Sequence, residues 1–88
     1  MKLTVLWSPK AESSLAALWA DDSQRGLVSQ AADAIDAILR EQAEKVGESR
    51  GDGTRILFVP PLGVCFEIFE QDGQVVVWEV WRYRKRSE

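Results

Sequence analysis

The chain has 88 residues, enough for one small domain with a single hydrophobic core. Hydrophobic residues make up 45% of it and charged residues 28%, the balance of a folded protein rather than a disordered one. Its net charge of −3 argues against a general nucleic-acid binder, which would carry a basic surface. Histidine, the commonest general base and metal ligand, is absent. We therefore expect no metal site and no cofactor.

The cellular compartment follows from cysteine usage and from the apolar runs. Cys65 is the single cysteine, so no intramolecular disulfide can form and the chain fits a reducing cytosol. Residues 1–7 lack the apolar region of a signal peptide. No apolar run approaches the length of a membrane span. We expect a cytoplasmic protein that has no membrane partner.

The first predicted elements are a strand and a helix. Apolar residues alternate with polar ones over residues 2–7, which predicts a strand. Ser8 is expected to cap a helix that begins at Pro9, and Glu12 suits the first helical turn, where the helix dipole favours an acidic side chain. The apolar stripe of this helix consists of Ala11, Leu15, Leu18 and Trp19.

A second helix is predicted over residues 24–44, after a short polar break. Asp22 or Ser23 is expected to cap it. Because the break between the helices is so short, they should pack as an antiparallel hairpin. One face of the second helix is apolar and consists of Val28, Ala31, Ala32, Ile35, Ile38 and Leu39.

The remainder of the chain is predicted to be β-structure. Residues 45–53 contain three glycines and are expected to form a loop. Neither proline of Pro60-Pro61 can donate to a ladder, so the pair separates two strands. Gly73 is expected to supply a positive φ in a hairpin turn. The predicted strands cover residues 55–59, 62–70 and 75–83.

These elements predict one α+β domain over residues 1–88 with the order β-α-α-β-β-β. The apolar stripes of the helical hairpin must be buried, so the hairpin should cover one face of a mainly antiparallel sheet. The other sheet face is left bare or is covered by a partner. We expect the last strand to lie centrally, between the first and third predicted strands.

The aromatic residues are divided between the core and the surface. Trp7 and Trp19 are expected in the core, and alternation points Trp78 inward with its even-numbered neighbours Val76 and Val80. Trp81 and Tyr83 then fall on the opposite face. Cationic side chains alternate with these two aromatic residues and continue after them, which makes the strand end basic. These cationic residues are Arg82, Arg84, Lys85 and Arg86.

Several segments resemble the RelE/ParE superfamily of toxins. Residues 5–15 read as a strand followed by a Ser-Pro-x-Ala-x-x-x-Leu helix start, as in that family. The long second helix with its Ala-Ile-Asp-Ala-Ile run at residues 34–38, the hairpin at residues 71–73 and the valine-rich last strand are similar too. The resemblance implies a toxin of a type II toxin–antitoxin pair, which either cleaves mRNA on the ribosome or inhibits DNA gyrase. It also implies a cognate antitoxin that wraps across the toxin.

The resemblance implies site residues as well. RNA cleavage without a metal needs a base, positive charge at the phosphate and an acid for the leaving oxygen. Arg55, Arg82 and Arg84 are the candidates for the phosphate, and Tyr83 for base stacking or proton donation. The family commonly has an arginine where this chain has Gly63. That change and the acidic balance weaken the prediction of a metal-independent endoribonuclease.

Two other interpretations of the same residues stay open. Trp81, Lys85 and Arg86 are candidates for binding a protein partner, in a catalytically degenerate binding module of the same fold. The basic cluster can also be a solubilising strand end without any site. A third and weaker possibility is a structural domain that has no toxic role.

Overall fold

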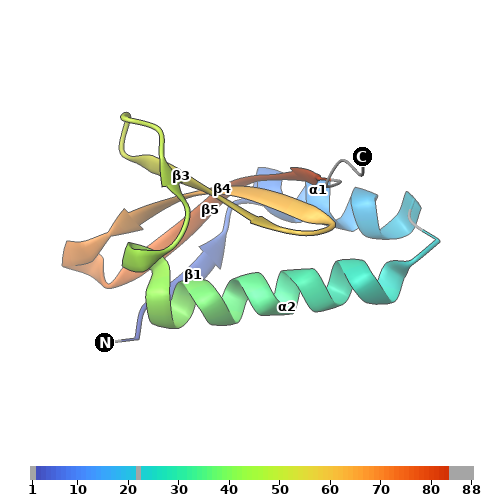
Figure 1. Cartoon of the computed structure of the whole chain (residues 1–88), viewed down its shortest axis with the longest axis horizontal. Helices are drawn as coiled ribbons and strands as arrows, with labels where there is room; N and C mark the ends of the chain where they lie inside the picture. The colour runs from blue at the N-terminus through green and yellow to red at the C-terminus, as the bar shows by residue number, and fades with distance from the viewer. Residues whose placement is uncertain (1, 22, 84–88) are drawn as a thin grey trace, which may run out of the picture.

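The computed structural model describes residues 2–21 and 23–83. It contains two α-helices and five strands, which confirms the predicted α+β class and order, with one short strand added (Figure 1). The elements are β1 (Thr4–Trp7), α1 (Pro9–Asp21), α2 (Arg25–Gln42), the 3-10 turn η1 (Ala43–Lys45), β2 (Glu48–Ser49), β3 (Thr54–Val59), β4 (Leu62–Phe69), the 3-10 turn η2 (Glu70–Asp72) and β5 (Gln74–Arg82).

The strands form one sheet in the order β1-β5-β4-β3-β2. β1 runs parallel to β5, and the other neighbours are antiparallel. The last strand therefore lies between the first strand and β4, as predicted. β2 was not predicted, because it lies within residues 45–53, which were expected to form a loop. Its Glu48 pairs with Ile56 of β3.

Side-chain and backbone hydrogen bonds tie the start of α1 to β5. The amide of Ala11 donates to Ser8 Oγ at 3.0 Å, which is the predicted cap. The Ser8 hydroxyl also donates to the carbonyl of Trp78 at 2.9 Å, and the Ser8 amide donates to the carbonyl of Val77 at 2.9 Å. One serine thus fixes where the chain leaves the sheet and becomes helical.

The cap predicted for α2 differs from the observed one. Gln24 is the N-cap residue and makes no side-chain cap bond, so Ser23 does not have that role. Asp22, the other candidate, lies outside the described residues. The turn at Gly73 is as predicted: its φ of 62° closes η2 and leads into β5.

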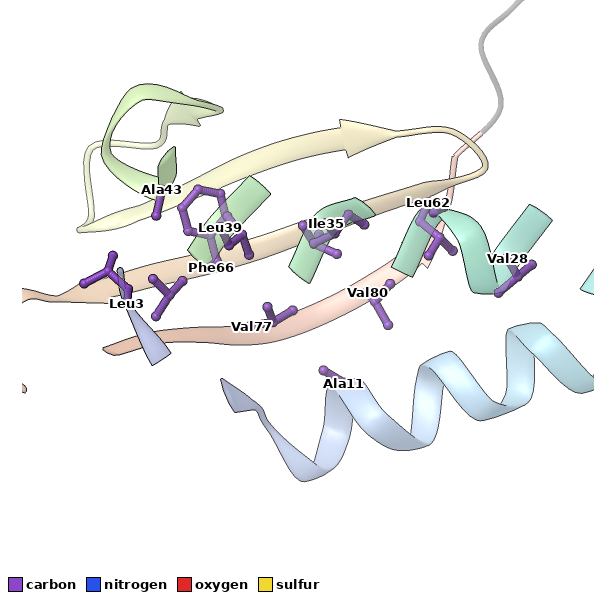
Figure 2. Packing of buried hydrophobic residues seen from close by; sticks show 13 residues of the cluster. Leu3, Ala11, Val28, Ile35, Leu39, Ala43, Leu62, Phe66, Val77 and Val80 are labelled. Atoms are coloured by element: carbon purple, nitrogen blue, oxygen red, sulfur yellow. The ribbon is translucent and has the colours of Figure 1, made fainter. Parts of the chain in front are cut away.

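The core lies between the helical hairpin and one face of the sheet. From α2, Val28, Ile35 and Leu39 are buried against the sheet, whereas α1 contributes only Ala11 as a fully buried residue. Figure 2 shows Ala11 pointing from α1 toward β5. The sheet supplies Leu62, Val64, Phe66, Val75, Val77 and Val80.

Two tryptophans expected inside are exposed instead. Trp19 is 44% exposed at the end of α1, with the guanidinium of Arg25 4.8 Å from its ring centroid. Trp78 is 39% exposed. The pairing of β4 with β5 passes from Cys65–Glu79 to Phe66–Val77, so Trp78 is an extra residue at a β-bulge. The bulge reverses the alternation of β5, and Val75 and Val77 are buried before it and Val80 after it.

Candidate functional site

The sheet face opposite the helices carries an apolar surface that no described element covers. Its residues alternate with the core residues along each strand, and none of them belongs to the core cluster. We call it the aromatic face. It consists of Leu6, Ile56, Phe58, Cys65, Phe69, Val76, Trp78, Trp81 and Tyr83.

At one end of the aromatic face, rings from β3 and β5 meet across β4. The ring centroids of Phe58 and Tyr83 are 4.3 Å apart, and those of Phe58 and Trp81 are 6.3 Å apart with an edge-on geometry. The strands bring them together because Phe58 and Trp81 both pair with Gly63 of β4. We call Phe58, Trp81 and Tyr83 the ring group. Phe58 remains 43% exposed, so the ring group is open to a partner.

Gly63 makes this ring arrangement possible. It is buried, and a Cβ built on it would lie 2.7 Å from both Cε2 and Nε1 of Trp81. The indole therefore lies directly on the backbone of β4. The resemblance to RelE/ParE toxins implies an arginine at the position that Gly63 occupies in this chain. Here that place on the sheet is filled by Trp81.

The described charges associated with the aromatic face include two carboxylates. Trp78 Nε1 donates to Oε1 of Glu67 at 3.0 Å, and the ring of Phe69 meets the Trp78 ring edge-on at 6.5 Å. Glu79 lies beside the bulge, with Lys10 Nζ of α1 3.3 Å from its Oε1. Carboxylates at these positions repel the phosphates of a nucleic acid and suit a protein partner.

Arg55 does not lie on the aromatic face. It pairs with Phe66, which places it on the helix side of β3. Its Nε donates to the carbonyl of Val46 at 2.9 Å and its Nη2 to the carbonyl of Gly47 at 3.1 Å. The guanidinium thus fixes the segment that follows α2.

Arg55→Ala is expected to lower the free energy of unfolding by about 2 kcal/mol, because two carbonyls would lose a charged donor. Urea denaturation of the purified variant measures this. Arg50→Ala is the control, because Arg50 is exposed on the neighbouring turn, and its loss should change stability by less than about 0.5 kcal/mol. An Arg55→Ala protein as stable as the wild type would contradict the anchoring role.

Two of the other predicted catalytic residues, Arg82 and Tyr83, lie at the end of β5. Arg82 is half-buried and pairs with Leu62, whereas Tyr83 donates its amide to the carbonyl of Pro61 at 2.8 Å and packs on Phe58. Arg84, Lys85 and Arg86 lie outside the described residues. Arg55 and Arg82 are separated by four residues of β4, about 13 Å along the strand, so the structure does not bring them together.

The turn between β2 and β3 has one perturbed carboxyl group. The side chain and amide of Thr54 both donate to Oδ1 of Asp52, and these hydrogen bonds lower the pKa of that carboxyl below its ordinary value. Asp52 is fully exposed and shapes the turn. Within residues 2–21 and 23–83, no group of three or more His, Cys, Asp or Glu side chains could hold a metal ion. In the same residues, no helix is both long and apolar enough to cross a membrane.

Two residues that form this site, one ring and the glycine beneath Trp81, were not predicted from the sequence. Phe58 was assigned to a strand without a role, and Gly63 was treated as a lost arginine. A signal for Phe58 was present, because alternation along β3 separates Ile56 and Phe58 from Leu57 and Val59. The contact of Gly63 with Trp81 depends on the pairing of β4 with β5, which the sequence of either strand alone does not show.

Several solved structures with this arrangement come from toxin–antitoxin systems. A chain of the toxin–antitoxin complex RelBE2 from Mycobacterium tuberculosis superposes with a TM-score of 0.78 at 18% identity, over 93% of this chain and 92% of that one. For a chain of the chromosomal ParDE system from P. aeruginosa the TM-score is 0.72 at 16% identity, over 94% and 98%. For the isolated E. coli RelE toxin it is 0.65 at 10% identity, over 96% and 87%.

These similarities define the class of fold. The protein has the fold of the RelE toxin and of the RelBE2 and ParDE chains, as the resemblance in sequence predicted. No protein-family model matches the chain, and no curated protein matches it. The identities are below 20%, so the structural similarity shows the fold alone. The activity has to be inferred from the residues on the sheet.

Proposed function

We propose that this protein is the toxin of a type II toxin–antitoxin pair, that a cognate antitoxin neutralises it, and that it acts by binding a protein target through the aromatic face. The family resemblance implies two targets, mRNA on the ribosome and DNA gyrase, and gyrase is the one that is a protein. The aromatic face carries the proposal: a folded monomer rarely leaves so many large apolar side chains of one sheet face in water unless they bind something.

The composition of the aromatic face supports a protein target over RNA. Aromatic side chains are enriched in the centres of protein interfaces, where they supply a large contact area at low entropic cost. Glu67 and Glu79 lie among them, and Trp81 fills the place of an arginine over Gly63. Arg55, the described arginine of β3, is engaged with backbone carbonyls on the helix side.

A ribosome-dependent endoribonuclease is the second candidate, and one observation favours it. Tyr83 lies against Phe58 at the end of β5, where an aromatic platform can stack an unpaired base. In the chain it is followed by Arg84, Lys85 and Arg86. These residues remain candidates for contacts to phosphate or to a partner protein.

Induced expression without an antitoxin tests the proposal. We expect growth arrest with filamentous cells and DNA damage while protein synthesis continues, because a blocked gyrase leaves DNA unable to relax or segregate. Microscopy and incorporation of labelled amino acids measure the two effects. Early loss of translation would instead support the endoribonuclease. Normal growth at high expression would contradict the toxin and favour a binding module that has no toxic role.

A further inference from the structure

Trp78 reaches the aromatic face through an irregularity of β5. It is the extra residue of the bulge, which takes it out of the alternation that buries Val77 and Val80. The side chain stays 39% exposed in spite of its size. Bulges commonly re-aim a side chain beside a functional site. The bulge therefore presents a tryptophan to whatever covers the aromatic face.

The backbone at the bulge is held from the helix layer. The Ser8 hydroxyl donates to the carbonyl of Trp78, and the Ser8 amide donates to the carbonyl of Val77, each at 2.9 Å. On the other side of Trp78, Oε1 of Glu79 lies 3.3 Å from Nζ of Lys10. The start of α1 thus fixes the position from which the Trp78 side chain leaves the sheet.

The indole of Trp78 is fixed as well. Its Nε1 donates to Oε1 of Glu67 at 3.0 Å, and the ring of Phe69 meets it edge-on with the centroids 6.5 Å apart. Glu67 and Phe69 both belong to β4, so the indole lies toward that strand. A side chain that is already held in one orientation loses little conformational freedom when it binds a partner. Trp78 is therefore a preformed contact point.

Glu67 places a negative charge beside this indole. It is half-buried, and within residues 2–21 and 23–83 no lysine or arginine forms an ion pair with it. A protein that covers the indole also shields the carboxylate from water. A carboxylate shielded in this way is destabilising unless a cation lies beside it, so the covering surface should carry a lysine or arginine there.

We propose that Trp78 is a second anchor of the aromatic face, whose indole enters an apolar pocket of the protein target while a lysine or arginine at the rim of that pocket pairs with Glu67. The ring group is the first anchor. Gly63 beneath it and Glu67 are separated by four residues of β4, about 13 Å along the strand. Two preformed aromatic anchors at this spacing fix the orientation of the target on the sheet. The choice of DNA gyrase as the target rests on the proposed function, whereas the fixed indole and the charge beside it do not.

The orientation of the indole is tested in the chain alone by nuclear magnetic resonance. The indole N–H signal of Trp78 is identified by its loss in Trp78→Phe. We expect this N–H to exchange with water at least about threefold more slowly than in free tryptophan, because it is hydrogen-bonded to Glu67. Glu67→Gln keeps an acceptor and should preserve the slow exchange, whereas Glu67→Ala should lose it. Exchange as fast as in free tryptophan would overturn the preformed anchor.

The anchor itself is tested by the affinity of purified DNA gyrase for matched variants. Trp78→Ala and Glu67→Lys should each raise Kd at least about tenfold, and Glu67→Gln, which removes only the charge, about fivefold. The controls are Trp19→Ala and Glu44→Lys, which change an exposed tryptophan and an exposed carboxylate outside the aromatic face. They should stay within about twofold of the wild type. If Trp78→Ala does not fold, Trp78→Phe replaces it with the same expected direction.

The outcomes separate the anchor from the proposed function. Variants that bind gyrase as tightly as the wild type would overturn the anchor and leave the target intact. Weaker binding by Trp78→Ala with unchanged binding by Glu67→Gln would overturn the cation at the pocket rim.

A wild type that does not bind gyrase would overturn the proposed target, and growth arrest by the same variants then decides the anchor. Relief of growth arrest by both Trp78→Ala and Glu67→Lys would keep the anchor for another protein target. Unchanged or stronger arrest by Glu67→Lys would overturn it, because an added cation favours a phosphate-bearing target. A wild type that neither binds gyrase nor arrests growth would overturn both proposals.

Discussion

Gly63→Ala is expected to lower the free energy of unfolding by about 1–3 kcal/mol, as overpacking of a filled site does. The new Cβ would lie 2.7 Å from two atoms of the Trp81 indole, so the ring must leave the backbone of β4. Urea denaturation measures the stability, and near-ultraviolet circular dichroism reports the loss of the fixed tryptophan environment. Gly26→Ala, at a glycine whose added Cβ meets nothing within 4 Å, is the control and should not be destabilising.

The same mutation has a second test in a double-mutant cycle. In a Trp81→Ala background the added methyl group at Gly63 has room, so its destabilising effect should disappear. An equal loss of stability in both backgrounds would mean that Gly63 is required for a reason other than the indole of Trp81.

The largest effect on activity is expected from combining Trp81→Ala with Tyr83→Ala. Truncating two central aromatic residues of an interface typically weakens binding by about 2 kcal/mol or more each, roughly a thousandfold together if the effects add. Growth of cells after induction should then be close to normal. The measurement is colony count after induction, with the soluble protein level confirmed in parallel.

Trp19→Ala provides the matched control for that double variant. Trp19 is an exposed tryptophan of similar size, but it lies on the helix side of the molecule. Its loss should leave growth arrest unchanged in the absence of an antitoxin. A soluble and folded Trp81→Ala, Tyr83→Ala protein that still arrests growth would rule out the aromatic face as the target-binding surface.

Features set by neighbours in the chain could be predicted from the sequence. Ser8 caps α1 because a serine before proline at a helix start satisfies the free amides, and Gly73 closes the last hairpin because its φ is positive. The apolar stripe of α2 also specifies its buried face. The central position of β5 was also expected and is confirmed.

Features set by strand pairing could not be predicted in the same way. The bulge at Trp78 appears only when β5 is aligned with β4, and it moves that tryptophan from the expected core to the surface. The anchoring of Arg55 likewise depends on the segment before β2, a strand too short to give a periodic signal. In both cases, the alternation of apolar and polar residues along one strand does not predict where the side chain lies.

We propose that the aromatic face binds a protein target and that DNA gyrase is that target. A supercoiling assay with purified gyrase and this chain tests it most directly, with the Trp81→Ala, Tyr83→Ala variant in parallel. The wild type is predicted to inhibit supercoiling and the variant to leave it intact. Full supercoiling in the presence of a wild-type protein that cleaves mRNA on ribosomes would contradict the claim.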